Sequence, residues 1–170
     1  MMRWHWLDCL LYLLLLGLLC FPAGRILALI PFDPESYPFR SLPFERNGKI
    51  YDAIHIRSWQ KLAPDVSKLV PGIVPKKAVE GKPDAGTMDR MLRETCVAEL
   101  THWLLCVAGI ALFWLWPGMG GVVLYILYVI LGNLPFILIQ RYHRPRLLRT
   151  RAILEKRERR MVHAGIDPEF

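Results

Sequence analysis

Three long apolar stretches constrain the fold of this chain more than any other feature. They cover about residues 6–30, 97–116 and 121–140. A helix needs about 20 apolar residues to cross the hydrocarbon core of a bilayer. With 54% hydrophobic residues and a mean hydropathy of +0.27, the chain is too apolar for a soluble domain of 170 residues. The sequence therefore predicts an all-α integral membrane protein with about three transmembrane helices and a cytoplasmic interfacial segment.

The excess of positive charge points to membrane lipids. The chain has 22 Lys and Arg against 15 Asp and Glu, and many of the basic residues lie beside apolar stretches. Anionic headgroups are the nearest partners for such residues. We therefore expect membrane lipids, and no nucleic acid, as partners.

Cysteine and histidine spacing gives no metal site. The four cysteines lie in or beside apolar stretches without a CxxC pair, which predicts neither a zinc site nor a disulfide framework. Glu99 and His102 have the ExxH spacing of carboxylate di-iron ligands, but such a site needs a second ExxH motif. We expect no metal.

The chain divides into four parts. Residues 1–30 form a first transmembrane helix that resembles a signal anchor, interrupted by "PAGR" at 22–25. Cleavage after Ala23 stays open, although apolar residues continue beyond it. Residues 31–87 form a cytoplasmic interfacial segment and a Pro/Gly-rich loop, residues 88–140 a transmembrane hairpin, and residues 141–170 a basic cytoplasmic tail.

The interfacial segment contains "KIYDAIHIRSWQKLAPD". Tyr51, Ile54 and Trp59 share a loose helical face, which suits an interfacial helix. The alternation over residues 54–57 also fits a short strand. From 64 to 87, several prolines and glycines favour an irregular loop.

The hairpin brings polar residues together. With Thr87 as N-cap, a helix over 88–116 places Thr95, Glu99, His102 and Cys106 on one stripe. After the "PGMGG" turn, Asn133 and Gln140 share one face of the third span, and Pro135 frees a backbone carbonyl. The antiparallel return predicts a cavity near the cytoplasmic leaflet, lined by Glu99, His102, Asn133 and Gln140, with Arg141 and Arg144 at its rim.

The distribution of basic residues predicts the orientation. The turn at 117–121 is uncharged, whereas the tail from 141 to 160 is densely cationic. Since basic segments stay in the cytoplasm, we expect a multi-pass protein of the cell membrane with its N-terminus outside and its C-terminus cytoplasmic.

Three stretches of the chain stand out together: "FERNGKIYDAIHIRSWQKLAPD", "RETCVAELTHW" and "NLPFILIQRYHRPRL". They resemble the glycosyl-4,4'-diaponeurosporenoate acyltransferase family of small bacterial membrane proteins, which act in staphyloxanthin-type carotenoid synthesis. The likeness covers about residues 43–66 and 88–150. His143 and the stretch 71–86 depart from the family pattern, which leaves open an acceptor that is another glycolipid or a lipid alcohol. The matching residues are Glu94, Glu99, His102, Trp103, Asn133, Pro135, Gln140, Arg141, Tyr142, Arg144, Pro145, Arg146 and Leu147.

The resemblance implies transfer of a fatty acyl group to a hydroxyl of a membrane-embedded glycolipid such as a glycosylated carotenoid. Acyl-CoA is the expected co-substrate, and no cofactor is expected. In this reaction His102 is a candidate general base, with Glu99 holding its ring.

The other candidate residues would bind the transition state or the substrates. Asn133, Gln140 and Tyr142 are candidate donors to the tetrahedral oxyanion. Trp103 is assigned to substrate binding. Arg141, Arg144 and Arg146 could hold the phosphates of acyl-CoA or of lipid headgroups.

Several alternatives stay open. Direct transfer is favoured, but Cys106, one turn deeper than His102, keeps an acyl-enzyme route open. The protein could also be a non-catalytic scaffold of a lipid or carotenoid biosynthetic complex. The polar stripes would then pack between helices, and Glu99 and His102 would form a hydrogen bond. Another small lipid-group transferase, for a methyl or prenyl group, is a third reading. The sequence leaves the oligomeric state open, including a homo-oligomer.

Overall fold

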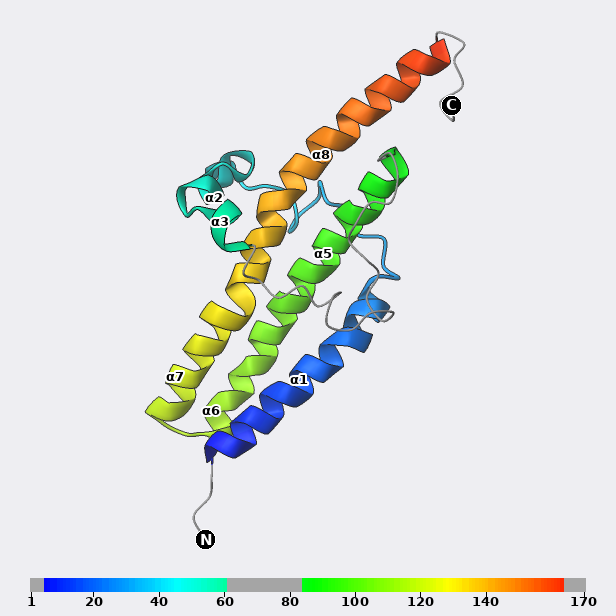
Figure 1. The fold of residues 1–170 in the computed structure, drawn as a ribbon. Helices are drawn as coiled ribbons and strands as arrows, with labels where there is room; N and C mark the ends of the chain where they lie inside the picture. The colour runs from blue at the N-terminus through cyan, green and yellow to red at the C-terminus, as the bar shows by residue number, and fades with distance from the viewer. Residues whose placement is uncertain (1–4, 61–83, 164–170) are drawn as a thin grey trace.

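The computed structural model describes residues 5–60 and 84–163, and every regular element within these ranges is helical (Figure 1). Three helical segments are long and apolar enough to cross a membrane: His5–Leu27, Ala85–Leu115 and Met119–His163. The predicted all-α class with three candidate transmembrane helices is thus confirmed.

Helix α1 (His5–Leu27) is an uninterrupted helix with many leucines on its surface. It runs through Pro22, so the interruption predicted at 22–25 is not a break in the helix. The hydroxyl of Tyr12 donates a hydrogen bond of 2.8 Å to the carbonyl of Ala108, and His5 Nδ1 donates one of 2.9 Å to the carbonyl of Leu115. These bonds attach α1 to the second span.

The second span is α5 (Ala85–Ala108), continued by a 3-10 turn, η3 (Gly109–Ala111), and by α6 (Leu112–Leu115). Its N-cap is Asp84, whose carboxylate accepts a bond of 3.1 Å from the backbone N–H of Thr87. The predicted N-cap, Thr87, is therefore wrong. A carboxylate three residues earlier already satisfies the N–H groups of the first turn.

The third span consists of α7 (Met119–Leu127), a π-helical turn η4 (Tyr128–Asn133) and α8 (Leu134–His163). In η4 the N–H of Leu134 bonds to the carbonyl of Val129, five residues earlier. Pro135 follows directly and has no N–H, which accounts for the widened turn at this point. Helix α8 does not end near residue 140 but continues through the basic segment to His163 (Figure 1).

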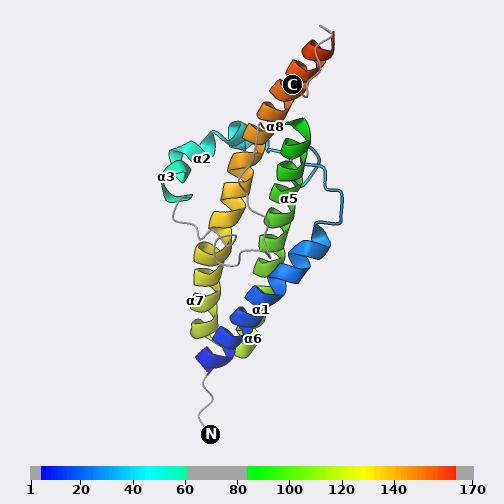
Figure 2. The ribbon, with the colours of Figure 1, turned by 45° about the vertical axis from the view of Figure 1, so that its right-hand side comes forward.

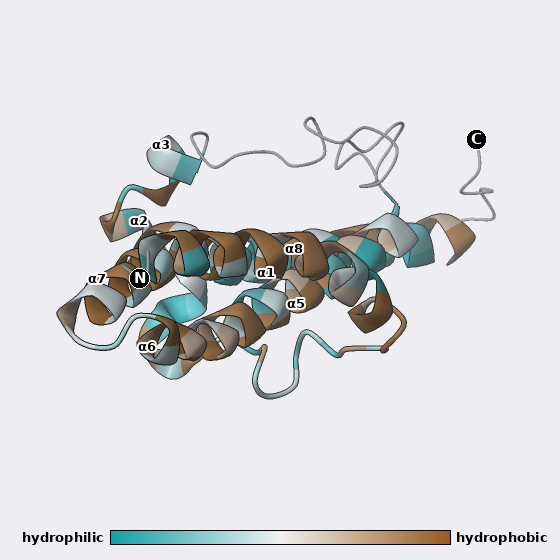
Figure 3. Cartoon of the chain, turned by 90° about the horizontal axis from the view of Figure 1, so that it is seen from below, coloured by the Kyte–Doolittle hydropathy of each residue, from teal (hydrophilic) through white to brown (hydrophobic). Residues whose placement is uncertain are grey.

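Helix α5 lies between α1 and α8 (Figures 1 and 2). The start of α1 and the turn between α6 and α7 lie at one end of the molecule, and the end of α8 lies at the other. Hydrophobic residues prevail along α6 and α7 (Figure 3). Apolar side chains on the outer surface include Leu14, Val107 and Trp114, as a lipid-facing surface requires.

The described part of the segment between α1 and α5, residues 28–60, folds against α8. It forms three short helices, η1 (Pro43–Gly48), α2 (Ile50–Ala53) and α3 (Ile56–Trp59). Buried Tyr51 and Ile56 pack on Tyr142 of α8. His55 has a φ of 53°, which separates α2 from α3, so the predicted interfacial helix is two single turns and the alternative strand is not formed. Most of the predicted loop over 64–87 lies outside the described residues.

The α6–α7 turn gives a first prediction. A Cβ added at Gly121 would lie 2.2 Å from the carbonyl oxygen of Trp116 and 2.8 Å from that of Leu112. Because these are backbone atoms, Gly121→Ala should open the turn and lower the midpoint of thermal unfolding in detergent by about 4 °C or more. At Gly17 an added Cβ meets nothing within 4 Å, so Gly17→Ala should leave the midpoint unchanged or raise it. Equal effects of the two substitutions would contradict this account.

Candidate active site

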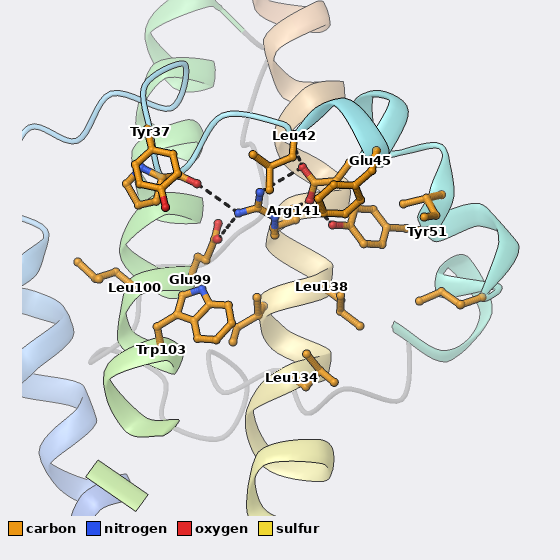
Figure 4. A pocket seen from close by; sticks show the side chains of 15 residues that line it. Tyr37, Leu42, Glu45, Tyr51, Glu99, Leu100, Trp103, Leu134, Leu138 and Arg141 are labelled. Atoms are coloured by element: carbon orange, nitrogen blue, oxygen red, sulfur yellow. Dashed lines mark hydrogen bonds and ion pairs between the residues drawn. The ribbon is translucent and has the colours of Figure 1, made fainter. Parts of the chain in front are cut away.

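A pocket of about 700 Å³ lies between α5, α8 and residues 37–54, and we call it the α5–α8 pocket (Figure 4). Its polar groups gather around Arg141, where Glu45, Tyr51 and Glu99 meet (Figure 4). The pocket thus combines an apolar chamber with a charged wall. The remaining lining residues are mostly apolar: Tyr37, Pro38, Leu42, Phe44, Ile50, Ile54, Leu100, Trp103, Leu134, Ile137 and Leu138.

Arg141 bridges two buried carboxylates from different parts of the chain. Its Nε and Nη2 donate to the two carboxylate oxygens of Glu45 at 2.6 and 3.1 Å, and its Nη1 donates to Oε1 of Glu99 at 2.6 Å. The Arg141 side chain is 12% exposed and both carboxylate side chains are 2% exposed. Its Nη1 and Nη2 also donate to the carbonyls of Pro38 and Arg40. All five N–H groups of this guanidinium therefore have partners within the protein.

Arg144 supports Glu99 from one turn further along α8. Its Nη2 lies 2.7 Å from Oε2 of Glu99, an ion contact outside hydrogen-bond geometry. Its Nε and Nη2 donate to the hydroxyl and carbonyl of Thr95 at 3.0 and 3.1 Å, and its Nη1 donates to the carbonyl of Phe39 at 2.6 Å. Glu45, Glu99, Arg141 and Arg144, which we call the four-charge cluster, have no net charge. Such pairing offsets the cost of removing these groups from water.

Glu45 is further held by its own segment. It accepts hydrogen bonds from the Tyr51 hydroxyl and, at 2.5 Å, from the backbone N–H of Leu42. Burial alone would raise the pKa of Glu45, but hydrogen bonds from Arg141 and Tyr51 outweigh it and hold that pKa below its ordinary value. Burial and the adjacent Glu45 carboxylate raise the pKa of Tyr51. At neutral pH Glu45 is therefore ionised and Tyr51 is neutral.

Sequence reasoning missed Glu45 and Tyr51 as site residues. Both lie in the first stretch that carries the family resemblance, which was the available signal. Nothing in the local pattern distinguishes Glu45 from a solvent-exposed carboxylate. Only the fold brings it to Arg141, 96 residues further along the chain.

His102 pairs with Asn133, and the predicted Glu99–His102 pair is wrong. His102 Nδ1 lies 3.1 Å from Oδ1 of Asn133, and the ring stacks on Phe136 with centroids 4.7 Å apart. The Asn133 side chain also donates to the carbonyl of Tyr128 at 3.1 Å. Two guanidinium groups are stronger partners for the Glu99 carboxylate than an imidazole.

The predicted cavity forms only in part. Glu99, Trp103 and Arg141 line the α5–α8 pocket, whereas His102, Asn133 and Gln140 are not among its lining residues. Arg144 contacts Glu99 but does not line the pocket, and its side chain is 2% exposed. It is therefore not at the rim, as predicted, but buried. The link of the His102–Asn133 pair to the pocket is along the chain: His102 directly precedes Trp103 and Asn133 directly precedes Leu134, and Trp103 and Leu134 line the pocket.

Tyr142 and Arg146 lie outside the pocket. The Tyr142 hydroxyl accepts a bond of 2.8 Å from Nε of Arg57. The Arg146 guanidinium lies 3.5 Å from the centroid of the Tyr142 ring and 3.3 Å from the Asp52 carboxylate. A role of Tyr142 as an oxyanion donor in the pocket therefore finds no support.

The predicted phosphate-binding role of the arginines also finds no support, since Arg141, Arg144 and Arg146 are all paired with carboxylates. Within residues 5–60 and 84–163, no group of three His, Cys, Asp or Glu side chains is placed to hold a metal ion.

The four-charge cluster gives a second prediction. Arg144→Gln leaves two buried carboxylates against one guanidinium, which should destabilise the protein by about 3–5 kcal/mol and lower its unfolding midpoint and yield. The double substitution Glu99→Gln, Arg144→Gln restores charge balance and should recover part of that loss. Arg149→Gln, at an exposed position on the same helix, is the control and should change stability by no more than about 0.5 kcal/mol. If Glu99→Gln lowered the stability of the Arg144→Gln variant by as much as it lowers that of the wild-type protein, the charge-balance account would be contradicted.

Comparison with known proteins identifies the family of this chain. The sequence profile of the glycosyl-4,4'-diaponeurosporenoate acyltransferase family matches residues 34–153, a range that contains the pocket, the four-charge cluster and the His102–Asn133 pair. An enzyme of that name from Staphylococcus aureus strain MRSA252 is 32% identical over 132 residues, which cover 76% of this chain and 77% of that protein. The protein of that name from strain USA300 is 30% identical over 123 residues, covering 72% and 73%. No solved structure matches the chain. The chain therefore belongs to the glycosyl-4,4'-diaponeurosporenoate acyltransferase family.

Proposed function

We propose that this protein transfers a fatty acyl group from acyl-CoA to a hydroxyl of a membrane-embedded glycolipid, such as a glycosylated carotenoid, at the α5–α8 pocket. The main support is the pocket itself, an apolar chamber of about 700 Å³ with hydrogen-bonding groups on one wall. An amphipathic molecule needs both surfaces. The relatives are named for an acceptor of this kind.

The charge balance of the pocket favours a neutral polar head. Glu45, Glu99 and Arg141 line the pocket. Arg144, which does not line it, balances the charge of Glu99. Carboxylates accept hydrogen bonds from hydroxyl groups, as a sugar would supply them. A phosphate would meet guanidinium groups that already have anionic partners.

The phosphates of an acyl-CoA donor would therefore bind elsewhere. Arg40, Arg46 and Lys49 are exposed, and they lie in the segment that forms one side of the pocket. We propose these three side chains for the donor, in place of Arg141, Arg144 and Arg146. Their side chains are exposed, so their charges would be available to an anion that approaches this segment.

We assign general-base catalysis to His102. Its imidazole would take the proton from the acceptor hydroxyl as the hydroxyl oxygen bonds to the thioester carbonyl. When the carbon–sulfur bond breaks, the imidazolium would give this proton to the leaving thiolate. Trp103 lines the pocket (Figure 4) and follows His102 in the sequence, and it is a candidate donor to the oxyanion through its indole N–H.

We propose the orientation with the N-terminus outside and the C-terminus cytoplasmic. Basic residues concentrate in the part of α8 at the opposite end from the start of α1, and that end would face the cytoplasm (Figure 1). A phosphatase that is active only outside the cytoplasm should be inactive when fused after His163. The same phosphatase should be active when the chain is truncated and fused after Pro117. The reverse pattern would refute the orientation.

The pocket prediction compares two tryptophan substitutions on α5. Leu100 lines the pocket, whereas Leu104 is 49% exposed and lies outside the lining. Leu100→Trp fills the apolar chamber and should lower kcat/KM for acyl transfer about tenfold or more. Leu104→Trp adds the same side chain at an outward-facing position and should change kcat/KM little.

The assay would use purified protein in micelles with palmitoyl-CoA and glycosyl-4,4'-diaponeurosporenoate, with the mass gain of one acyl group as readout. Equal losses in the two variants would place the reaction outside the pocket. If the wild-type protein forms no acylated product under these conditions while it remains folded, the scaffold alternative is favoured.

A further inference from the structure

The orientation of the Asn133 amide is fixed by two partners. One end of the amide lies 3.1 Å from the carbonyl oxygen of Tyr128, which can only accept a hydrogen bond. The amide nitrogen must therefore face Tyr128. The amide oxygen is left facing Nδ1 of His102, at 3.1 Å.

This arrangement determines which nitrogen of His102 carries the proton. An amide oxygen can only accept, so the bond to Asn133 requires an N–H at Nδ1 of His102. A neutral imidazole has one such proton, and Nε2 then has the free lone pair. Within residues 5–60 and 84–163, no hydrogen bond is made to Nε2.

The local backbone holds Asn133 in place. Asn133 is 1% exposed and ends the π-helical turn η4, whose widened geometry allows its side chain to reach the Tyr128 carbonyl. One face of the His102 ring stacks on Phe136 with an interplanar angle of 5°. Both the amide and the imidazole are therefore fixed in orientation. π-helical turns occur frequently at functional sites.

We propose that Asn133 is a positioning residue that holds His102 in its Nδ1–H tautomer and so makes Nε2 the atom that removes the proton from the acceptor hydroxyl. The catalytic part of this inference rests on the proposed acyl transfer, whereas the tautomer does not. In this proposal Asn133, and not Glu99, is the residue that orients His102. Asn133 is then no longer a candidate oxyanion donor. A neutral amide orients the ring without adding a charge inside the membrane.

Nitrogen-15 NMR of the full-length protein tests the tautomer directly, without any substrate. In protein labelled with nitrogen-15 histidine, the two ring nitrogens of each tautomer have distinct shifts and couplings to the ring protons. His102→Gln identifies the His102 signals among those of the five histidines. We expect a protonated Nδ1 and an unprotonated Nε2 near neutral pH. A protonated Nε2 at His102 would overturn the proposal.

Two substitutions at Asn133 test the cause. Asn133→Asp keeps an oxygen that accepts from Nδ1, and His102 should retain its Nδ1 proton. Asn133→Leu removes the acceptor, and the proton should move largely to Nε2. An unchanged tautomer in Asn133→Leu would overturn the role of Asn133. Leu131→Ala, at an exposed position in the same π-helical turn, is the control and should leave the His102 signals unchanged.

Kinetics in the acyl-transfer assay test the consequence. Asn133→Leu should lower kcat on the order of ten- to a hundredfold with little change in KM, the scale seen when a histidine loses its orienting partner. Asn133→Asp should retain more of kcat than Asn133→Leu, and His102→Gln should lose about a hundredfold or more. Equal kcat losses in the two Asn133 variants would refute the positioning role. If the wild-type protein showed no transfer, the proposed function would fail while the NMR result on the tautomer would stand.

Discussion

The interaction on which the rest of the structure depends is the pairing of Arg141 with two buried carboxylates. Glu45 belongs to the segment after α1, Glu99 to α5, and Arg141 to α8. A single guanidinium thus joins three separate pieces of chain, and Arg144 adds the second positive charge that balances the cluster. Because an unpaired charge at this depth would be costly, the wall of the pocket is held as one unit.

The same cluster determines the environment of His102. Since both oxygens of Glu99 face guanidinium groups, the carboxylate is not available to the imidazole three residues along α5. The imidazole instead meets Asn133, which the π-helical turn before Pro135 presents on the facing helix. Glu99 therefore joins the helices, whereas His102, three residues further along α5, is held by Asn133 and remains available for the proposed base catalysis.

Much of the fold follows from one-dimensional patterns. Apolar stretches of sufficient length specify the spans, and "PGMGG" specifies a tight hairpin, because these properties depend on a residue's own chemistry and its nearest neighbours. The stripe of Thr95, Glu99 and His102 follows from helical periodicity in the same way. Where local signals compete, as between Asp84 and Thr87 at the start of α5, the pattern alone chose the wrong cap.

The partners of the polar residues could not be obtained in this way. The sequence by itself predicted that Glu99, His102, Asn133 and Arg141 lie on facing sides of two antiparallel helices. Only the tertiary structure decided that Glu99 binds Arg141 and Arg144 while His102 binds Asn133, and that Glu45 and Tyr51 complete the polar wall of the pocket. The physical reason is that a hydrogen bond or ion pair requires contact within about 3 Å, whereas periodicity gives only the face of a helix. That contact depends on how α5, α8 and the segment around Glu45 pack together.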